Sequence, residues 1–222
     1  MNALLFIGVA LLAYLSGGLN GAILFSHLLY HKDIRDYGSH NPGFTNFKRV
    51  FGATGWIVFL FDILKTAVPL LVGSLLFSHF LDMRQLGAAY AGFFAMLGTA
   101  FPVWYRFHGG KAVVACLATS FFVDWRAALI AFGIFFVLLM TVKLMSLSSM
   151  TFAVAFPVLL LLPVFRITPL YAECFVVLSS LLVILRHRAN IVRLCKGEEK
   201  KFLLFGKKKA QISPANEEKK QS

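Results

Sequence analysis

Four polar segments interrupt an otherwise apolar chain, and the longest carries residue types suited to binding phosphate. Within residues 33–49, Gly38 and Gly43 let the backbone approach a ligand, and Pro42 limits the freedom of the turn. Arg49 can hold two phosphate oxygens at once. A solvated connector with a helix cap has a similar composition, so composition alone leaves both interpretations open. The candidate ligands are Gly38, Ser39, Asn41, Thr45, Asn46 and Arg49.

The second segment places two glycines directly before a lysine at the start of an apolar stretch. Gly109 and Gly110 precede Lys111. A helix N-terminus carries free N–H groups and a partial positive charge, so phosphate is the natural guest there. Alone this is a weak signal, and the nearby Trp104 and Tyr105 are typical of any membrane interface.

The third and fourth segments carry hydroxyl, imidazole and amide groups. Ser148 and Ser149 stand near a helix boundary, where hydroxyls can bind a ligand but more often cap the helix, and spacing favours capping. Helical spacing places His187 and Asn190 on neighbouring turns of one face. The alternative makes the flanking arginines membrane anchors and His187 an interfacial histidine.

The elements that position these segments are membrane helices. Of 222 residues, 59% are hydrophobic and 14% charged, too few polar residues to cover a water-soluble fold. A crossing needs about 20 apolar residues, so the fourth stretch is short. We predict an all-α, polytopic integral membrane protein with about seven transmembrane helices, and five is the conservative count. The apolar stretches are 3–29, 52–77, 86–104, 112–123, 127–142, 150–165 and 168–185.

The distribution of basic residues predicts the orientation of the chain. With seven crossings, 18 Lys and Arg residues fall on one side and 3 on the other, with Lys65 inside a crossing. Loops rich in Lys and Arg stay cytoplasmic, so we expect the N-terminus outside and the C-terminus in the cytoplasm. The first stretch lacks a basic leader and is expected to be a retained helix. All four polar segments then share the cytoplasmic face.

The distribution of charge indicates the class of binding partner, and the cysteine spacing bears on metal sites and disulfides. The net charge is +12, but half of the 22 basic residues follow residue 185, where anionic lipid headgroups would attract them. Membrane lipids are therefore the expected partner, and nucleic acid is not. Cys116, Cys174 and Cys195 show no metal-binding or disulfide spacing. We expect one membrane domain over residues 1–195 and a basic cytoplasmic tail over 196–222, disordered toward its end.

Asp62 and Lys65 form a charged pair inside the second apolar stretch. Each charge costs about 2.5 to 3.5 kcal/mol at the centre of a membrane helix, so both are expected to face the protein interior as an ion pair. Either helix packing or a polar cavity would account for them.

Together, these segments resemble the bacterial acyl-phosphate:glycerol-3-phosphate acyltransferases, the PlsY family. The first family motif is similar to Asp33-Ile34-Arg35, then residues 38–46 and Arg49, with departures at His40 and Phe44. The second is similar to residues 98–112, and the third to His187-Arg188-Ala189-Asn190-Ile191-Val192-Arg193-Leu194, followed by Gly197 and Glu198. Asp62 with Lys65, and the serines at 146–149 after Lys143, also match family positions.

The resemblance implies an enzyme of phospholipid synthesis in the bacterial cell membrane, with its site open to the cytoplasm. It would transfer a fatty acyl group from acyl phosphate to the 1-hydroxyl of glycerol 3-phosphate, giving lysophosphatidic acid and phosphate, without a metal or nucleotide cofactor. The implied catalytic residues are Ser39, Arg49, Lys111, His187 and Asn190. The implied substrate-binding and phosphate-binding residues are Gly38, Asn41, Thr45, Asn46, Gly109, Gly110, Ser148 and Ser149.

Three departures fall in the second motif. Thr99 replaces a family histidine, His108 a lysine and Ala112 a glycine. A divergent paralogue with weak or altered activity therefore stays open. So does a non-enzymatic membrane binder or transporter of phosphorylated lipid or polyol phosphate. The sequence leaves open the acyl-chain preference, the acceptor of the hydroxyl proton and the oligomeric state.

Overall fold

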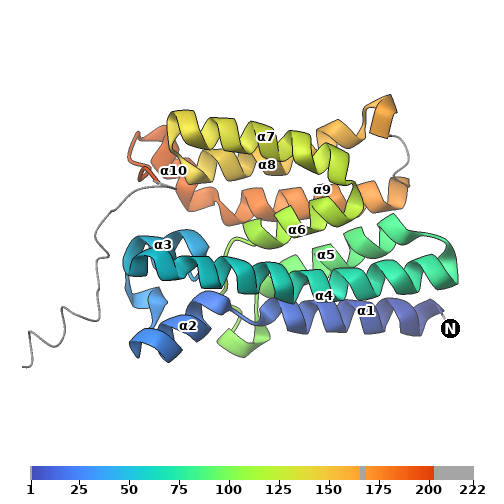
Figure 1. Ribbon diagram of the computed structural model, residues 1–222, viewed down its shortest axis with the longest axis horizontal. Helices are drawn as coiled ribbons and strands as arrows, with labels where there is room; N and C mark the ends of the chain where they lie inside the picture. Colours follow the sequence, from blue (N-terminus) through green and yellow to red (C-terminus); the bar gives the residue numbers. More distant parts are fainter. Residues whose placement is uncertain (1, 166–168, 203–222) are drawn as a thin grey trace, which may run out of the picture.

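The computed structural model describes residues 2–165 and 169–202, and within these ranges the ordered elements are all helical (Figure 1). This confirms the predicted all-α class. The long elements are α1 (Asn2–Gly18), α2 (Gly21–Tyr30), α3 (Phe44–Phe51), α4 (Gly55–Leu81), α5 (Arg84–Ala100), α6 (Val113–Val123), α7 (Trp125–Val142), α8 (Met145–Leu160), α9 (Leu170–Arg186) and α10 (Arg188–Cys195). Single 3-10 turns lie at Ile34–Asp36, Gly52–Thr54, Val103–Tyr105 and Pro163–Phe165.

Helix α5 is the centre of the bundle. It packs against α1, α4, α6 and α9, and its alanines Ala88, Ala91 and Ala95 are fully buried. Small side chains let helix backbones approach closely, which is the usual basis of helix association in membranes. The alanine-rich composition of this segment therefore explains why it takes the central position.

The outer surface of the bundle is apolar. Leu4, Leu60, Val68 and Val137 are each more than half exposed on helix faces that carry no polar covering, as expected for surfaces that contact lipid. Within the described ranges, four helical stretches are long and apolar enough to cross a membrane, and a fifth is added if α9 and α10, bent by 57°, count as one. Helices α6 and α8 are apolar but shorter.

The first apolar stretch is interrupted between α1 and α2, and this break is tied to the polar loop that follows α2. Between α1 and α2, the freed carbonyl of Leu19 accepts a hydrogen bond from the Lys65 ammonium group. Lys65 also pairs with Asp62 at 2.9 Å, which confirms the expected ion pair. Asn20 caps α2 by accepting from Ile23 N at 3.0 Å, and its amide donates to Pro42 O at 3.1 Å. The buried pair thus stabilises the break, and Asn20 ties it to the loop.

The chain folds back onto the bundle after α10. The Phe202 amide donates to Lys143 O at 2.8 Å, and its ring is 5% exposed, in a cluster with Phe44 and Leu139. The first part of the predicted tail, residues 196–202, therefore packs against the membrane domain. The domain boundary at residue 195 stays a prediction, and the rest of the tail lies outside the described residues.

Candidate active site

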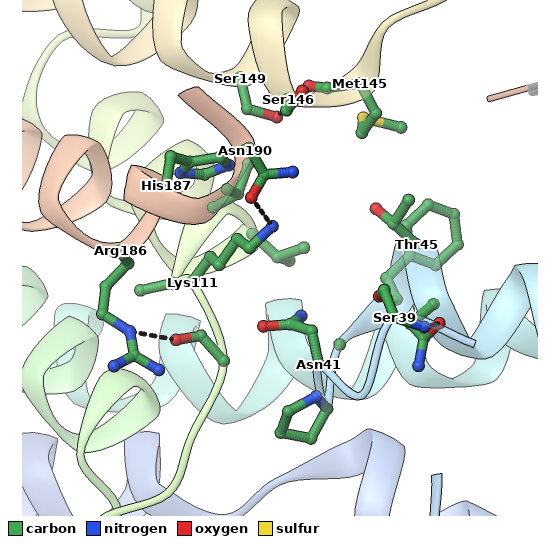
Figure 2. A pocket seen from close by; sticks show the side chains of 18 of the residues that line it. Ser39, Asn41, Thr45, Lys111, Met145, Ser146, Ser149, Arg186, His187 and Asn190 are labelled. Carbon is green, nitrogen blue, oxygen red and sulfur yellow. Dashed lines mark hydrogen bonds between the residues drawn. The ribbon is translucent and has the colours of Figure 1, made fainter. Parts of the chain in front are cut away.

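The four polar segments meet around one cavity of about 870 Å³. Figure 2 shows Lys111 reaching toward Asn190 beneath Ser146 and Ser149, with Ser39 and Asn41 of the first loop and Thr45 of α3 facing them. Twelve of the thirteen predicted site residues line this cavity. They are Gly38, Ser39, Asn41, Thr45, Asn46, Arg49, Gly109, Gly110, Lys111, Ser149, His187 and Asn190.

The first loop takes its shape from a buried amide. Asn46, only 1% exposed, accepts from Ser39 N at 2.8 Å and donates to Tyr37 O at 2.9 Å. Gly38 has φ of 68°, and a Cβ there would lie 2.3 Å from Asn46 Oδ1, so only glycine fits. Asn46 therefore uses its side chain to hold the loop in position, while Ser39, also on the cavity wall, keeps its hydroxyl for other contacts.

A second segment of backbone, Gly109 and Gly110, lines the cavity wall. We call it the glycine segment. The Gly110 amide donates to Thr99 O at 3.0 Å. Arg186 donates from Nε to Gly110 O at 3.0 Å and from Nη2 to Gly109 O at 2.7 Å. A Cβ on Gly109 would lie 2.2 Å from Thr99 O. Gly109 is therefore required for close packing against the end of α5, and the hydrogen bonds from Arg186 hold the two carbonyls in place.

A hydrogen-bonded chain links the lysine to an acidic residue. Lys111 Nζ donates to Asn190 Oδ1, and Asn190 Nδ2 donates to Glu199 Oε1 at 2.7 Å. Glu199 also accepts from Ser146 Oγ and from Arg193 Nε, each at 2.8 Å. The carboxylate thus fixes the amide orientation that presents an oxygen to Lys111.

The electrostatics of the cavity favour an anion. Seven Lys and Arg side chains but only two carboxylates line it, and both carboxylates are paired, Asp62 with Lys65 and Glu199 with Arg193. Burial, against the opposing effect of Glu199 and together with the nearby Arg193, Arg49 and Arg186 cations, lowers the pKa of Lys111 to about 8. At neutral pH Lys111 is therefore still mostly charged, and an anion in the cavity would strengthen that charge.

Glu199 stays ionised despite its burial. Its side chain is 10% exposed. Burial raises the pKa of the Glu199 carboxyl group, but hydrogen bonds from Ser146, Asn190 and Arg193 outweigh this effect and leave the pKa below its ordinary value. A permanent negative charge therefore stands behind Asn190.

His187 presents one defined ring nitrogen to the cavity. It lies just beyond the end of α9 and is 2% exposed. Its Nδ1 is 2.8 Å from Val183 O. A carbonyl can only accept, so Nδ1 carries the hydrogen and Nε2 of the neutral ring is an acceptor. Burial, followed by the Lys111 cation, lowers the pKa of His187 to about 4. The ring is therefore neutral at pH 7.

The serine segment divides its hydroxyls between two environments. Ser146 and Ser149 line the cavity, whereas Ser148 does not: it is fully buried and donates to Leu144 O at 3.1 Å. Ser149 likewise donates to Met145 O, at 2.7 Å. Ser146, which sequence spacing did not single out, is the serine that joins the Glu199 network.

The other end of the cavity is apolar. Side chains of α4, α6, α7 and α8 line it without a polar group of their own. Those residues are Phe59, Val113, Val114, Leu117, Phe132, Phe135, Phe136, Leu139 and Phe152. Phe136 is also 39% exposed on the outer surface. One cavity therefore joins a cationic, hydrogen-bonding half to an apolar half that reaches the lipid-facing surface.

Sequence reasoning missed Glu199 and Arg186 as parts of the site. Both sit among basic residues that the positive-inside pattern already explained. The signal for Glu199 was present in a pair of acidic residues directly after Gly197, within an otherwise basic segment. Arg186 carried no distinguishing signal, because its role depends on the Gly109 and Gly110 carbonyls of a distant segment.

Of the three departures in the second motif, Thr99 and Ala112 line the main cavity. Thr99 Oγ1 donates to backbone oxygens, with Gly17 O and Ala95 O each at 3.0 Å. His108 lies outside the main cavity. Ala112 lines it and has φ of 59°, a left-handed conformation that favours glycine. The Lys111–Asn190–Glu199 network is intact despite these substitutions.

Fold and site together define an all-helical membrane protein that joins a phosphate-type anion site to an apolar chamber. The family profile described as Glycerol-3-phosphate acyltransferase matches residues 7–197. Glycerol-3-phosphate acyltransferases of Lactiplantibacillus plantarum and Synechococcus elongatus are 35% and 36% identical to this chain. The alignments cover 85% and 87% of it, and 88% and 92% of those proteins.

Solved structures agree with the sequence comparison. The crystal structure of PlsY (YgiH), an integral membrane glycerol 3-phosphate acyltransferase, in its glycerol 3-phosphate form, is similar with a TM-score of 0.80 and 29% identity. It covers 89% of this chain and 96% of that one. The lysophosphatidic acid form is similar with a TM-score of 0.77, 28% identity and coverage of 89% and 95%. The chain belongs to the glycerol-3-phosphate acyltransferase family and is an acyltransferase enzyme of the membrane.

Proposed function

We propose that this enzyme takes its acyl group from a fatty acyl phosphate and transfers it to the 1-hydroxyl of glycerol 3-phosphate. The observation that carries the proposal is the position of Lys111, a half-buried cation that lines the cavity just before Val113 and Val114 of its apolar half. An acyl phosphate has the same division: a phosphate head suits the cationic half, and an acyl chain gains about 0.8 kcal/mol per buried methylene in the apolar half.

The polar residues take distinct roles in this proposal. Arg49 and Lys111 hold phosphate oxygens, and Ser39 adds a hydroxyl from the first loop. Asn190, fixed by Glu199, keeps Lys111 in position. Gly109 and Gly110 carry the backbone past Thr99 and Pro42, and that backbone lines the cavity beside the bound acyl phosphate. The remaining contacts to substrate come from Gly38, Asn41, Thr45 and Ser149, which line the same cavity, and Asn46 holds the loop that carries them.

The chemistry needs alignment and charge stabilisation more than a strong base. The glycerol 3-phosphate hydroxyl oxygen bonds to the acyl carbon, and the bond from that carbon to the phosphate oxygen breaks. Phosphate leaves with the bonding electrons, and the cations stabilise the charge that develops on it. His187 Nε2 accepts the hydrogen bond of the attacking hydroxyl. Because its low pKa makes His187 a poor store for a proton, the proton ends on the departing phosphate.

Replacement of Lys111 tests the assignment. Purified Lys111→Ala in phosphatidylcholine nanodiscs, given palmitoyl phosphate and glycerol 3-phosphate, should release phosphate and form lysophosphatidic acid about a hundredfold or more slowly. Lys196→Ala, a matched removal of an exposed lysine outside the cavity, should retain the wild-type rate. Undiminished turnover by Lys111→Ala would remove Lys111 from this role. If wild-type protein failed to use acyl phosphate but accepted another acyl donor, the proposed donor would be wrong.

For topology, we propose seven crossings in a bacterial cell membrane, with the N-terminus outside and the cavity open to the cytoplasm. Helix α6 has 11 residues, about 16 Å at 1.5 Å per residue, less than the hydrocarbon thickness. The glycine segment before α6 is not helical. It lines the cavity, where irregular backbone is tolerated at membrane depth.

Labelling of engineered cysteines tests this topology. In a background without Cys116, Cys174 and Cys195, Ser39→Cys and His108→Cys should react with an impermeant maleimide only after the cytoplasmic face is opened. Arg126→Cys should react in intact cells. Reaction of His108→Cys and Ser39→Cys from opposite faces would contradict the arrangement.

A further inference from the structure

A second, smaller pocket adjoins the main cavity at the glycine segment. Its volume is about 330 Å³. It shares His40, Pro42, Gly109 and Arg186 with the main cavity and adds Arg35, Phe107 and His108. We name it the side pocket. Because four residues line both spaces, an anion in one lies next to the other.

Arg186 gives the side pocket its positive charge. Its guanidinium lies 5.1 Å from the centre of the Phe101 ring, and two of its nitrogens donate to the Gly110 and Gly109 carbonyls. These partners are neutral, and in residues 2–165 and 169–202 no carboxylate forms an ion pair with Arg186. A half-buried cation without a counter-charge favours an anion at its remaining N–H groups.

Arg35 does not supply a second uncompensated charge. Its Nε donates to both carboxylate oxygens of Asp33 at 3.0 Å, and Nη2 donates to Asp33 Oδ2. The pair fixes Arg35 beside the pocket with its charge balanced. The side pocket therefore offers one strong cation rather than a broad basic patch.

Two histidines offer acceptors to the same space. His40 Nδ1 lies 2.8 Å from Arg35 O, and His108 Nδ1 lies 2.6 Å from Arg106 O. A carbonyl accepts, so each Nδ1 carries its hydrogen, and each neutral ring has a lone pair at Nε2. The pocket thus combines guanidinium donors with imidazole acceptors.

This combination selects among anions. Inorganic phosphate at neutral pH has oxygens that accept from Arg186 and at least one P–OH group that can donate to an imidazole. Sulfate is fully deprotonated, has no hydroxyl, and would face the imidazole lone pairs with oxygen atoms alone. Phosphate diesters such as phosphatidylcholine also lack the P–OH group.

We propose that the side pocket binds inorganic hydrogen phosphate and is the route by which the leaving phosphate departs. The route rests on the proposed acyl phosphate donor, whereas binding itself does not. Phosphate released beside Lys111 passes to Arg186, which lines both spaces, and then meets the two histidines. Lysophosphatidic acid, with its acyl chain in the apolar half, leaves toward lipid.

Binding is tested without acyl phosphate, so that failure of the donor assignment is a separate result. Lys111→Ala in phosphatidylcholine nanodiscs, with the main phosphate site weakened, is titrated with radiolabelled phosphate. Adding His40→Gly with His108→Leu should weaken the remaining binding about tenfold or more. Glycine suits the φ of 58° at residue 40. His79→Leu, at an exposed histidine on α4, is the matched control and should leave binding unchanged.

Anion competition gives the second arm. A tenfold excess of sulfate should fail to displace phosphate from the side pocket, and arsenate, which like inorganic phosphate keeps a hydroxyl group at neutral pH, should compete. Equal displacement by sulfate, or undiminished binding in the histidine variant, would overturn the proposal. Stronger competition by a short-chain phosphatidic acid than by arsenate would assign the pocket to a lipid headgroup instead of the free anion.

A measurement on the unmutated chain guards against misfolded variants. With histidine labelled by ¹³C, phosphate should shift the ring resonances of His40 and His108 and leave that of His79 in place. Sulfate should leave all three unchanged. Absence of any shift at His40 and His108 at saturating phosphate would refute binding at this site.

Discussion

The Glu199→Gln variant tests whether the Glu199 carboxylate positions Asn190 and Lys111 or only lies near them. Glu199 accepts from Ser146, Asn190 and Arg193 at 2.7 to 2.8 Å. Glutamine keeps the size of the side chain but replaces one acceptor oxygen with an NH₂ group, which cannot accept from Arg193. A hydrogen bond to a charged group contributes about 1.5 to 3 kcal/mol, so we expect kcat/KM for glycerol 3-phosphate to fall roughly 10- to 100-fold.

The pH dependence of this variant is a second, independent readout. In the wild type, kcat/KM should fall as pH rises through about 8, because Lys111 loses its proton there. Glu199 raises the pKa of Lys111, so its neutral replacement lowers that pKa further. The alkaline limb should therefore move to lower pH, and the loss of activity should be greater at pH 7.5 than at pH 6.

The assay is continuous phosphate release from palmitoyl phosphate between pH 5.5 and 9.5, with thermal unfolding measured on the same samples. Glu198→Gln is the matched control, since Glu198 is the exposed neighbour of Glu199. It should leave both rate and pH profile unchanged. Equal behaviour of the two variants, or an unmoved limb in a folded Glu199→Gln, would refute the positioning role.

Three further substitutions test local geometry. Ala112→Gly removes a left-handed alanine at φ of 59° and should raise the melting temperature by roughly 2 °C in differential scanning fluorimetry, because relief of strain exceeds the added entropy of the unfolded chain; a lower melting temperature would contradict this account. Ser149→Ala should reduce kcat/KM about fivefold, while Ser148→Ala, whose hydroxyl lies outside the cavity, should change it less than twofold; equal losses would contradict the distinction.

Much of the fold was predictable because membrane helices follow from composition. Each long apolar stretch became helical, since hydrocarbon leaves backbone N–H and C=O groups no other partner. Polar loop residues at 38–49, 109–111 and 187–190 converged as their chemistry and their likeness to the family implied. The Asp62–Lys65 pair was predictable from the free-energy cost of an isolated charge in a membrane helix.

Local sequence decided which side chains could bind phosphate, and tertiary structure decided which of them do other work. Asn46 and Ser148 have suitable side chains, but the fold directs one to hold the loop and the other to a helix carbonyl. Glu199 and Arg186 looked like parts of a charged terminus. Folding brings Glu199 against Asn190 and Arg186 against the glycine segment. The physical reason is that hydrogen-bond partners far apart in the chain are chosen only when the helices pack. The residue types determine which hydrogen bonds each group can donate or accept, and helix packing determines which partner each group meets.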